Sequence, residues 1–102
     1  MTSKKRAYWR AQANGLKPLF QVGKEGLSDE FIKQADDALR ARELIKLRVL
    51  IETAPESPKE IAGKVAAATG SEVIQVVGGS MVFYRYNPEL HKKDKKNKRK
   101  SK

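Results

Sequence analysis

The chain has 102 residues and a formal net charge of +10, from 22 lysines and arginines against 12 aspartates and glutamates. This length suits one small domain with one core, and no apolar run approaches the ~20 residues that a membrane-spanning helix needs. No amphipathic helix with a large apolar face adjoins the basic C-terminal end, so we expect no membrane partner. The absence of cysteine excludes disulfides and cysteine-ligated zinc, and it fits a cytoplasmic location.

The positive charge is concentrated at the two ends of the sequence. Residues 87–102 carry eight basic side chains against two acidic ones, and residues 1–10 carry four basic side chains and no acid. The segment 11–86 has ten side chains of each sign and is neutral. Basic ends favour a polyanionic partner, with nucleic acid ahead of an acidic membrane, although basic tails also serve only to keep proteins in solution.

The first half of the sequence predicts a helix, a short strand and a second helix. Residues 2–14 have helical periodicity and end in an Asn-Gly stop signal. Residues 19–22 form a short apolar run after a proline, which is typical of a strand. Ser28 can cap a helix that continues to about residue 42, with acids in its first turn and arginines in its last turn.

The second half predicts a strand, a helix and a hairpin. Side chains alternate along residues 44–52, which places one apolar set on a single face of a strand: Ile45, Leu47, Val49 and Ile51. SPKE at residues 57–60 is a capping box that begins a helix ending at Gly70. Residues 72–86 indicate two strands joined at a Gly-Gly turn.

This order, α-β-α-β-α-β-β, predicts an α/β two-layer sandwich. Strands that alternate with helices pair in parallel through crossover helices, and the closing hairpin makes the four-stranded sheet mixed. The polar alternate positions in residues 44–52 indicate that the helices lie mainly on one face. We therefore expect a folded domain at residues 1–86, followed by a disordered lysine-rich tail at residues 87–102.

The sequence offers no catalytic or metal constellation. His91 is the only histidine and there is no cysteine, so we find neither a Ser-His-Asp or Cys-His arrangement nor a His/Cys metal cluster. Asp36 and Asp37 are neighbours on a predicted helix and point about a quarter-turn apart, which fits solvated surface charge better than paired catalytic carboxylates. We expect no enzyme activity, no metal and no cofactor.

The Gly23-Lys24-Glu25-Gly26 loop is the first candidate binding site. It links a predicted strand to a helix start, where free backbone N–H groups point toward the loop. Its glycines let a nucleic-acid backbone approach closely, and its lysine supplies a charge. Glu25 and two acids in the first helical turn oppose a phosphate. The residues alone leave open whether this is a phosphate contact or a plain tight turn.

The polar face of the sheet is a second candidate. Four side chains can point outward there: Lys46, Arg48, Gln75 and Arg85. Phe83 joins them if Val82, Tyr84 and Tyr86 point into the core. Some RNA-binding domains stack bases on such a basic sheet with an aromatic ring, whereas the plainer interpretation is a solvated face.

Tyr8 and Trp9 are neighbours on the predicted first helix, so at most one of them faces the core squarely. Either ring can stack on a base, but a tryptophan on a short helix more often packs against the protein. Both interpretations stay open at this point.

Two blocks of the sequence occur in a recognisable order. Leu16–Val49, LKPLFQVGKEGLSDEFIKQADDALRARELIKLRV, has the Gly-x-x-Gly loop between a strand and a helix. Val73–Arg85, VIQVVGGSMVFYR, is a closing hairpin that ends in an aromatic-Arg pair. Together they resemble the CRM domain family (chloroplast RNA splicing and ribosome maturation), and most of all its single-domain bacterial YhbY-type members, over about residues 4–86.

The resemblance implies an RNA-binding domain related in fold to the C-terminal domain of bacterial translation initiation factor 3. Family members of this size are associated with precursors of the large ribosomal subunit. The family's loop motif falls on Gly23, Lys24, Glu25 and Gly26, and the analogy with KH domains implies that it meets the RNA backbone. The acidic Glu25 departs from a purely basic phosphate clamp.

The sequence therefore favours a monomeric RNA-binding protein that acts on ribosomal RNA during large-subunit (pre-50S) ribosome biogenesis. The predicted RNA-binding residues are Gly23, Lys24, Glu25, Gly26, Lys5, Arg6, Arg10, Lys17, Lys46, Arg48 and Arg85. The basic tail would add non-specific phosphate contacts. The alternative is a protein-interaction module that docks on a ribosomal or other partner and meets RNA only through its tail.

Overall fold

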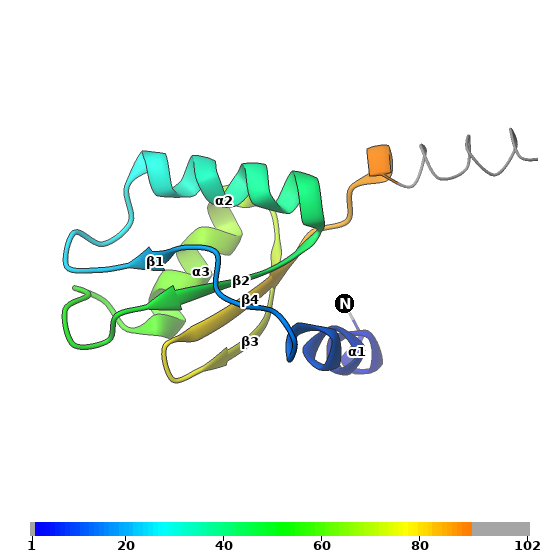
Figure 1. Cartoon of the computed structure of the whole chain (residues 1–102), viewed down its shortest axis with the longest axis horizontal. Helices are drawn as coiled ribbons and strands as arrows, with labels where there is room; N and C mark the ends of the chain where they lie inside the picture. Colours follow the sequence, from blue (N-terminus) through cyan, green and yellow to red (C-terminus); the bar gives the residue numbers. More distant parts are fainter. Residues whose placement is uncertain (1, 91–102) are drawn as a thin grey trace, which may run out of the picture.

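Two helices cover one face of a four-stranded mixed sheet, and a third helix crosses the other face (Figure 1). The computed structural model describes residues 2–90. Its elements are α1 (Ser3–Ala13), β1 (Gln21–Val22), α2 (Asp29–Arg42), β2 (Leu44–Val49), α3 (Pro58–Thr69), β3 (Glu72–Val77) and β4 (Ser80–Tyr84). This order and the mixed sheet confirm the predicted fold class.

The sheet has the strand order β1-β2-β4-β3. β1 and β2 are parallel and are joined by α2, while β4 is antiparallel to both of its neighbours. β2 and β3 are joined by α3, and they run parallel to each other because both are antiparallel to β4, which lies between them. β3 and β4 are linked by the two glycines at positions 78 and 79, as the sequence predicted.

Helices α1, α2 and α3 each begin at a capping residue, and for α2 and α3 these are the residues that the sequence indicated. Thr2, Ser28 and Ser57 each accept a hydrogen bond from the backbone N–H three residues ahead, at 3.2, 3.0 and 3.3 Å. Each such cap typically contributes ~1 kcal/mol to helix stability. Local sequence alone thus fixes where the helices start.

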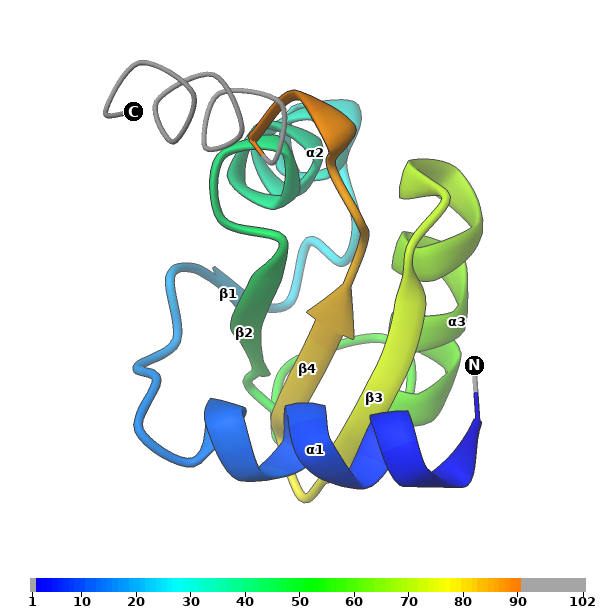
Figure 2. The same cartoon turned by 90° about the vertical axis from the view of Figure 1, so that its right-hand side faces the viewer.

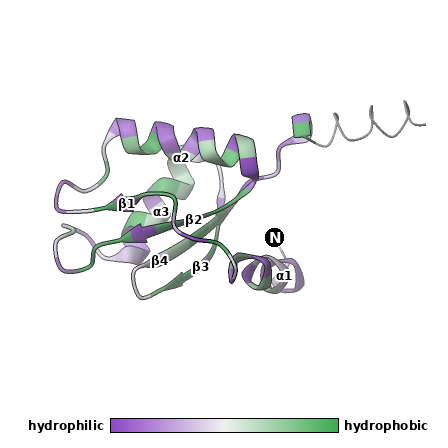
Figure 3. Ribbon diagram, in the orientation of Figure 1, coloured by the Kyte–Doolittle hydropathy of each residue, from purple (hydrophilic) through white to green (hydrophobic). Residues whose placement is uncertain are grey.

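The main core lies between the sheet and the helices α2 and α3. Its buried members are Val22, Phe31, Ala35, Leu39, Ile45, Leu47, Val49, Ile61, Ala62, Val65, Met81 and Phe83. They recur every second residue along β2 and every fourth residue along α2, as the geometry of a strand and a helix requires. Figure 3 shows the same alternation of hydrophilic and hydrophobic residues along α2.

The side chains of β4 face the opposite way from the arrangement in which Phe83 would be an exposed stacking ring. Phe83 is fully buried in the main core, whereas Val82 and Tyr84 lie on the face that α1 crosses. Antiparallel pairing puts Phe83 opposite Ile45 of β2, and side chains of directly opposite residues share a face. The interpretation of Phe83 as an exposed stacking ring is therefore wrong.

β1 and β2 are both shorter than predicted. β1 comprises two residues instead of residues 19–22, and β2 ends at Val49 instead of residue 52. The last pairing between them is the Leu50 N–H, which donates to the Val22 carbonyl oxygen at 2.8 Å. The chain leaves β1 for the loop after that point, so the segment after β2 has no parallel neighbour beyond Leu50 and also turns away from the sheet. Ile51, predicted to face the core, is 56% exposed.

α1 runs across the strands on the face opposite to α2 and α3 (Figure 2). A small second cluster fastens it, with Ala13, Ile74 and Val82 buried and Trp9 packed against them. The Trp9 indole stacks on the Tyr84 ring, with centroids 4.3 Å apart and an interplanar angle of 22°. Such a pair contributes ~0.5–1.5 kcal/mol beyond the area that it buries. Trp9 is thus a packing residue.

Most of the predicted tail, residues 91–102, lies outside the described residues. Asn87, the first residue of the predicted tail at residues 87–102, contacts the folded domain. Its N–H donates to Glu43 Oε2 at 2.7 Å, and its side-chain amide donates to the Arg40 carbonyl oxygen at 2.5 Å. A truncation meant to remove only the basic tail should therefore begin at residue 91.

We expect the substitution Gly79→Ala to destabilise the fold. An added Cβ would lie 2.4 Å from the Val49 carbonyl oxygen, next to the 2.7 Å hydrogen bond from the Val49 N–H to the Gly79 carbonyl oxygen. The free energy of unfolding in urea should fall by about 2 kcal/mol or more.

Gly63→Ala is the matched control, because a Cβ at this exposed position of α3 meets nothing within 4 Å. It should raise the free energy of unfolding by ~0.5–1 kcal/mol through helix propensity. Equal effects of the two substitutions would contradict the close approach at the hairpin turn.

Candidate nucleic-acid interface

The Gly23–Gly26 segment is a tight turn after β1. The Gly26 N–H donates to the Gly23 carbonyl oxygen at 3.0 Å, and Lys24 and Glu25 are exposed between them. Gly26 has φ +72°, and a Cβ there would lie 3.0 Å from Pro55, so the turn itself requires glycine at this position. A Cβ at Gly23 would make only ordinary contacts, the nearest at 3.7 Å. The fold therefore explains one of the two glycines.

The loop carries more negative than positive charge. Lys24 is its cation, whereas Glu25 and the first-turn residues Asp29 and Glu30 are exposed acids. Exposed charges within a Debye length, about 8 Å at physiological ionic strength, act together on a phosphate. The loop alone is thus a weak anion site, and attraction for a polyanion must come from cations elsewhere.

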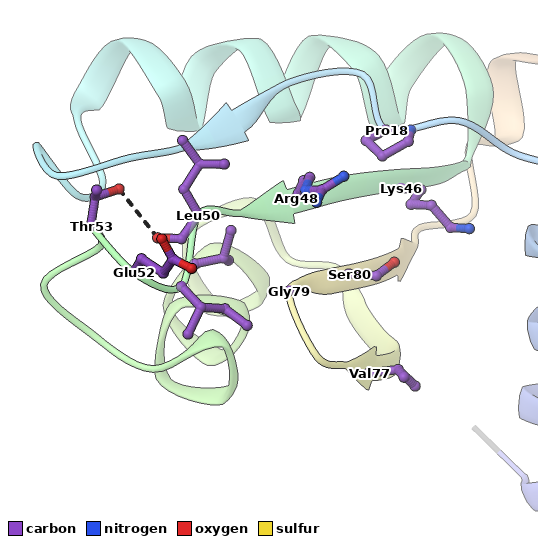
Figure 4. Close-up of a pocket in the computed structure, with 11 residues that line it drawn as sticks. Pro18, Lys46, Arg48, Leu50, Glu52, Thr53, Val77, Gly79 and Ser80 are labelled. Atoms are coloured by element: carbon purple, nitrogen blue, oxygen red, sulfur yellow. Dashed lines mark hydrogen bonds between the residues drawn. The ribbon is translucent and has the colours of Figure 1, made fainter.

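An open groove lies on the sheet face beside the loop (Figure 4). Lys46 and Arg48 of β2 line it, together with Pro18 and Ser80. Both cations alternate with core residues along β2 and therefore point away from the main core. The turn after β2 completes the groove with residues 50–53, a contribution that sequence reasoning missed because it placed residues 50–52 in a strand.

α1 lies at the far end of the sheet from the loop (Figure 1). It packs near the starts of β2 and β3 and the end of β4, whereas the loop adjoins the turn that follows β2. Six residues of strand span about 20 Å. The cations of α1 and the loop, which the sequence analysis grouped together as predicted RNA-binding residues, are therefore not adjacent in the structure, and the two cations of β2 lie between them.

The remaining predicted cations are exposed at the α1 end or in the linker to β1. Lys5 and Arg10 are exposed on α1, and Arg6 lies 3.8 Å from Glu72 of β3. Lys17 is exposed in the linker, beside the proline that lines the groove. These residues border the same face but do not form one cluster with the loop.

The CRS1 / YhbY (CRM) domain matches residues 1–85. The chain belongs to the CRM domain family. It is 38% identical over 89 residues to "Probable RNA-binding protein YqeI" of Bacillus subtilis, an alignment covering 87% of this chain and 92% of the relative. It is 40% identical over 101 residues to "Probable RNA-binding protein MJ0652" of Methanocaldococcus jannaschii, covering 94% of this chain and 75% of the relative.

A solved structure also resembles this CRM domain. The solution structure of the hypothetical protein SAV1595 from Staphylococcus aureus, a candidate RNA-binding protein, superposes with a TM-score of 0.73. The two sequences are 42% identical, and the match covers 85% of this chain and 90% of SAV1595. SAV1595 thus shares both sequence similarity and the overall fold with this chain.

Membrane spans and metal clusters are both absent from the described part of this CRM domain. Within residues 2–90, no helix combines the length and the apolar content needed to cross a bilayer. In the same range, no three potential metal-ligating side chains (His, Cys, Asp or Glu) come together around one point.

Arg85, predicted to point out from the open sheet face, instead ties together three elements of the CRM domain. Its Nη1 donates to Asp36 Oδ1 at 2.5 Å and to the Thr69 carbonyl oxygen at 2.6 Å, and its Nη2 donates to the Asp36 carbonyl oxygen at 3.0 Å. The end of β4 is thereby fixed to α2 and α3. The prediction of Arg85 as an outward-facing cation is wrong, because sequence reasoning assigned its partner Asp36 to the solvated surface.

The Asp36–Arg85 pair makes stability depend on pH. The hydrogen bond from Arg85 lowers the pKa of the Asp36 carboxyl below its ordinary value, and the Arg85 and Arg40 charges act in the same direction. A carboxyl whose pKa is lower in the folded state contributes stability above its unfolded pKa of about 4, and loses it as the pH falls through the folded value.

We expect Asp36→Asn to lower the free energy of unfolding by about 1 kcal/mol at pH 7, a modest value because the pair is partly exposed. Near pH 3 the difference from the wild type should shrink, which urea denaturation at both pH values would measure. The control Asp37→Asn removes only an exposed 3.5 Å contact with Arg40 and should change stability by less than about 0.5 kcal/mol. A constant Asp36→Asn effect at both pH values would contradict the linkage.

Proposed function

We propose that this CRM domain binds RNA through the open groove of its sheet and the Gly23–Gly26 loop, and that it acts in the cytoplasm on ribosomal RNA of the large-subunit precursor. The observation that carries the RNA contact is the position of Lys46 and Arg48. They lie on the uncovered part of a sheet face, next to a loop whose own charge is unfavourable.

The cations of β2 supply the attraction that the loop lacks. Lys46 and Arg48 are two residues apart on one strand, so their Cα atoms lie about 7 Å apart on the same face. Their spacing suits two phosphates of one RNA strand rather than a single anion. Lys17 and Lys24 flank them at either side, and the turn at Gly23–Gly26 places the Lys24 side chain at an exposed tip.

We propose RNA as the partner because of the names of the relatives, and ribosomal RNA as the target because of the family resemblance. YqeI and MJ0652 are both named as probable RNA-binding proteins, and SAV1595 shares the fold. Single-domain members of the family are associated with large-subunit precursors, which is the source of the proposed target. The basic side chains of residues 91–102 would add sequence-independent affinity.

We expect the double substitution Lys46→Glu, Arg48→Glu to weaken RNA binding by more than about tenfold. It should also lower the slope of log affinity against log salt by about one for each phosphate that the variant no longer binds. The matched control is Lys33→Glu, Lys59→Glu, which makes the same charge change at exposed positions of α2 and α3. Filter binding or fluorescence anisotropy with a single-stranded RNA would measure both.

The comparison should be made in the full chain and in a version that ends at residue 90. If the two double variants bind RNA with equally reduced affinity, net charge alone governs binding and the groove is not the interface. If all affinity leaves with residues 91–102, the folded domain has another role, such as docking on a ribosomal protein.

We expect RNA crosslinked to this protein in cells to be enriched in precursors of large-subunit ribosomal RNA. Mapped peptides should include the loop or β2, since these elements carry the proposed interface. Deep sequencing would identify the crosslinked RNA, and mass spectrometry would identify the crosslinked peptides. Crosslinks spread in proportion to the abundance of every cellular RNA would contradict the ribosomal target.

A further inference from the structure

A second hollow lies at the α1 end of the domain, apart from the groove. It is lined by Tyr8, Trp9, Tyr84 and Tyr86, with Lys4 and Lys5 beside them. These rings are all three tyrosines and the only tryptophan of the sequence. They come from α1, from the end of β4 and from the segment after it, so the fold brings them together from distant parts of the chain.

The packing of α1 uses only part of this aromatic cluster. Trp9 stacks on Tyr84 and seats the helix, and the Tyr8 ring meets the Trp9 ring edge-on, with centroids 4.9 Å apart and an angle of 76°. Tyr8 remains 56% exposed and Tyr86 55% exposed. Large exposed rings gathered around one hollow are typical of an interaction site, whereas isolated ones need no explanation.

We propose that this hollow takes one unpaired nucleobase of the bound RNA, stacked against Tyr8 and Tyr86, with the adjoining phosphate held by Lys4 or Lys5. This inference rests on the proposed function. Stacking of a base on aromatic side chains tolerates any sequence, because every base has a π-face, and it is a general means of holding single-stranded RNA.

The charges around the hollow favour a nucleotide over a bare anion. Both lysines lie on the first turn of α1, and Glu72 of β3 also lines the hollow and lies 3.8 Å from Arg6. A phosphate deep in the hollow would meet the Glu72 carboxylate at close range. A nucleotide can instead turn its base toward the rings and Glu72 while its phosphate stays near the lysines.

The position of the hollow fits a single RNA segment that also reaches the groove. The hollow lies where β2 and β3 begin and β4 ends, and the loop lies at the opposite end of the sheet. The ~20 Å between these ends corresponds to about six nucleotides at the 3.4 Å spacing of one stacked strand. Stacking at one end and phosphate contacts at the other would together fix the direction of the strand on the domain.

Trp9 provides a direct probe, because it is the only tryptophan and it lines the hollow. Titration of the full chain with a single-stranded RNA of ten adenosines should change Trp9 fluorescence. An oligomer of the same length and charge, in which abasic sugars replace the nucleosides, should bind through its phosphates and leave the emission nearly unchanged. Equal fluorescence changes with both oligomers would overturn the inference.

Substitution of the exposed rings tests the stacking itself. Tyr8→Ala or Tyr86→Ala should weaken binding of the adenosine oligomer by about tenfold, and Tyr8→Phe, which keeps the ring, should restore the affinity. The slope of log affinity against log salt should stay unchanged, since every phosphate contact remains. Thermal unfolding checks that each variant folds, which is expected because both rings are more than half exposed.

The outcomes separate this inference from the proposed function. If Tyr8→Ala binds RNA like the wild type while Lys46→Glu, Arg48→Glu does not, RNA binding stands and the hollow is not its base site. If neither variant changes the affinity, the proposed interface itself is wrong. If Tyr8→Ala lowers the affinity for the abasic oligomer equally, the hollow acts on phosphates and the stacking inference fails.

Discussion

The pairing register of β4 is the constraint on which the rest of this CRM domain depends. β4 lies between β2 and β3; the two-residue turn at Gly78 and Gly79 sets its alignment with β3, and it pairs with β2 with Phe83 opposite Ile45. A shift by one residue would send Phe83 to the outside and Val82 into the main core. The same register presents Tyr84 to α1, and Arg85, the next residue, is bonded to α2 and α3. The position of this one strand thus determines the packing of the main core, the packing of α1 on the sheet, and the hydrogen bonds from Arg85 to α2 and α3.

Much of the fold could be predicted from local signals. Capping residues, the alternation along β2 and the Gly-Gly turn are properties of a few neighbouring residues, and these features match the structure. The ends of β1 and β2 could not be predicted, because a strand ends where its partner ends. The facing of Phe83 also depends on pairing with Ile45, a residue 38 positions away in the sequence. Such long-range register has no local signature.

The candidate site shows the same division. The sequence identified the loop and the cations of β2, because glycine spacing and alternation are visible in one dimension. It did not reveal that α1 and the loop lie at opposite ends of the sheet, nor that Arg85 is engaged with Asp36. The aromatic hollow was equally hidden, since Tyr8 and Tyr86 are far apart in the chain. The sequence shows which residue types are present, and only the structure shows which of them lie close together.

α1 is fastened to the sheet by its own small cluster, separate from the main core that α2 and α3 share. Elements held by few buried contacts can open while the remainder of a domain stays folded. The free energy that keeps α1 in place is therefore separable from the global stability. A ligand that contacts both α1 and the end of β4 would suppress this local opening of α1. Binding of such a ligand would therefore slow amide hydrogen exchange in α1 alone.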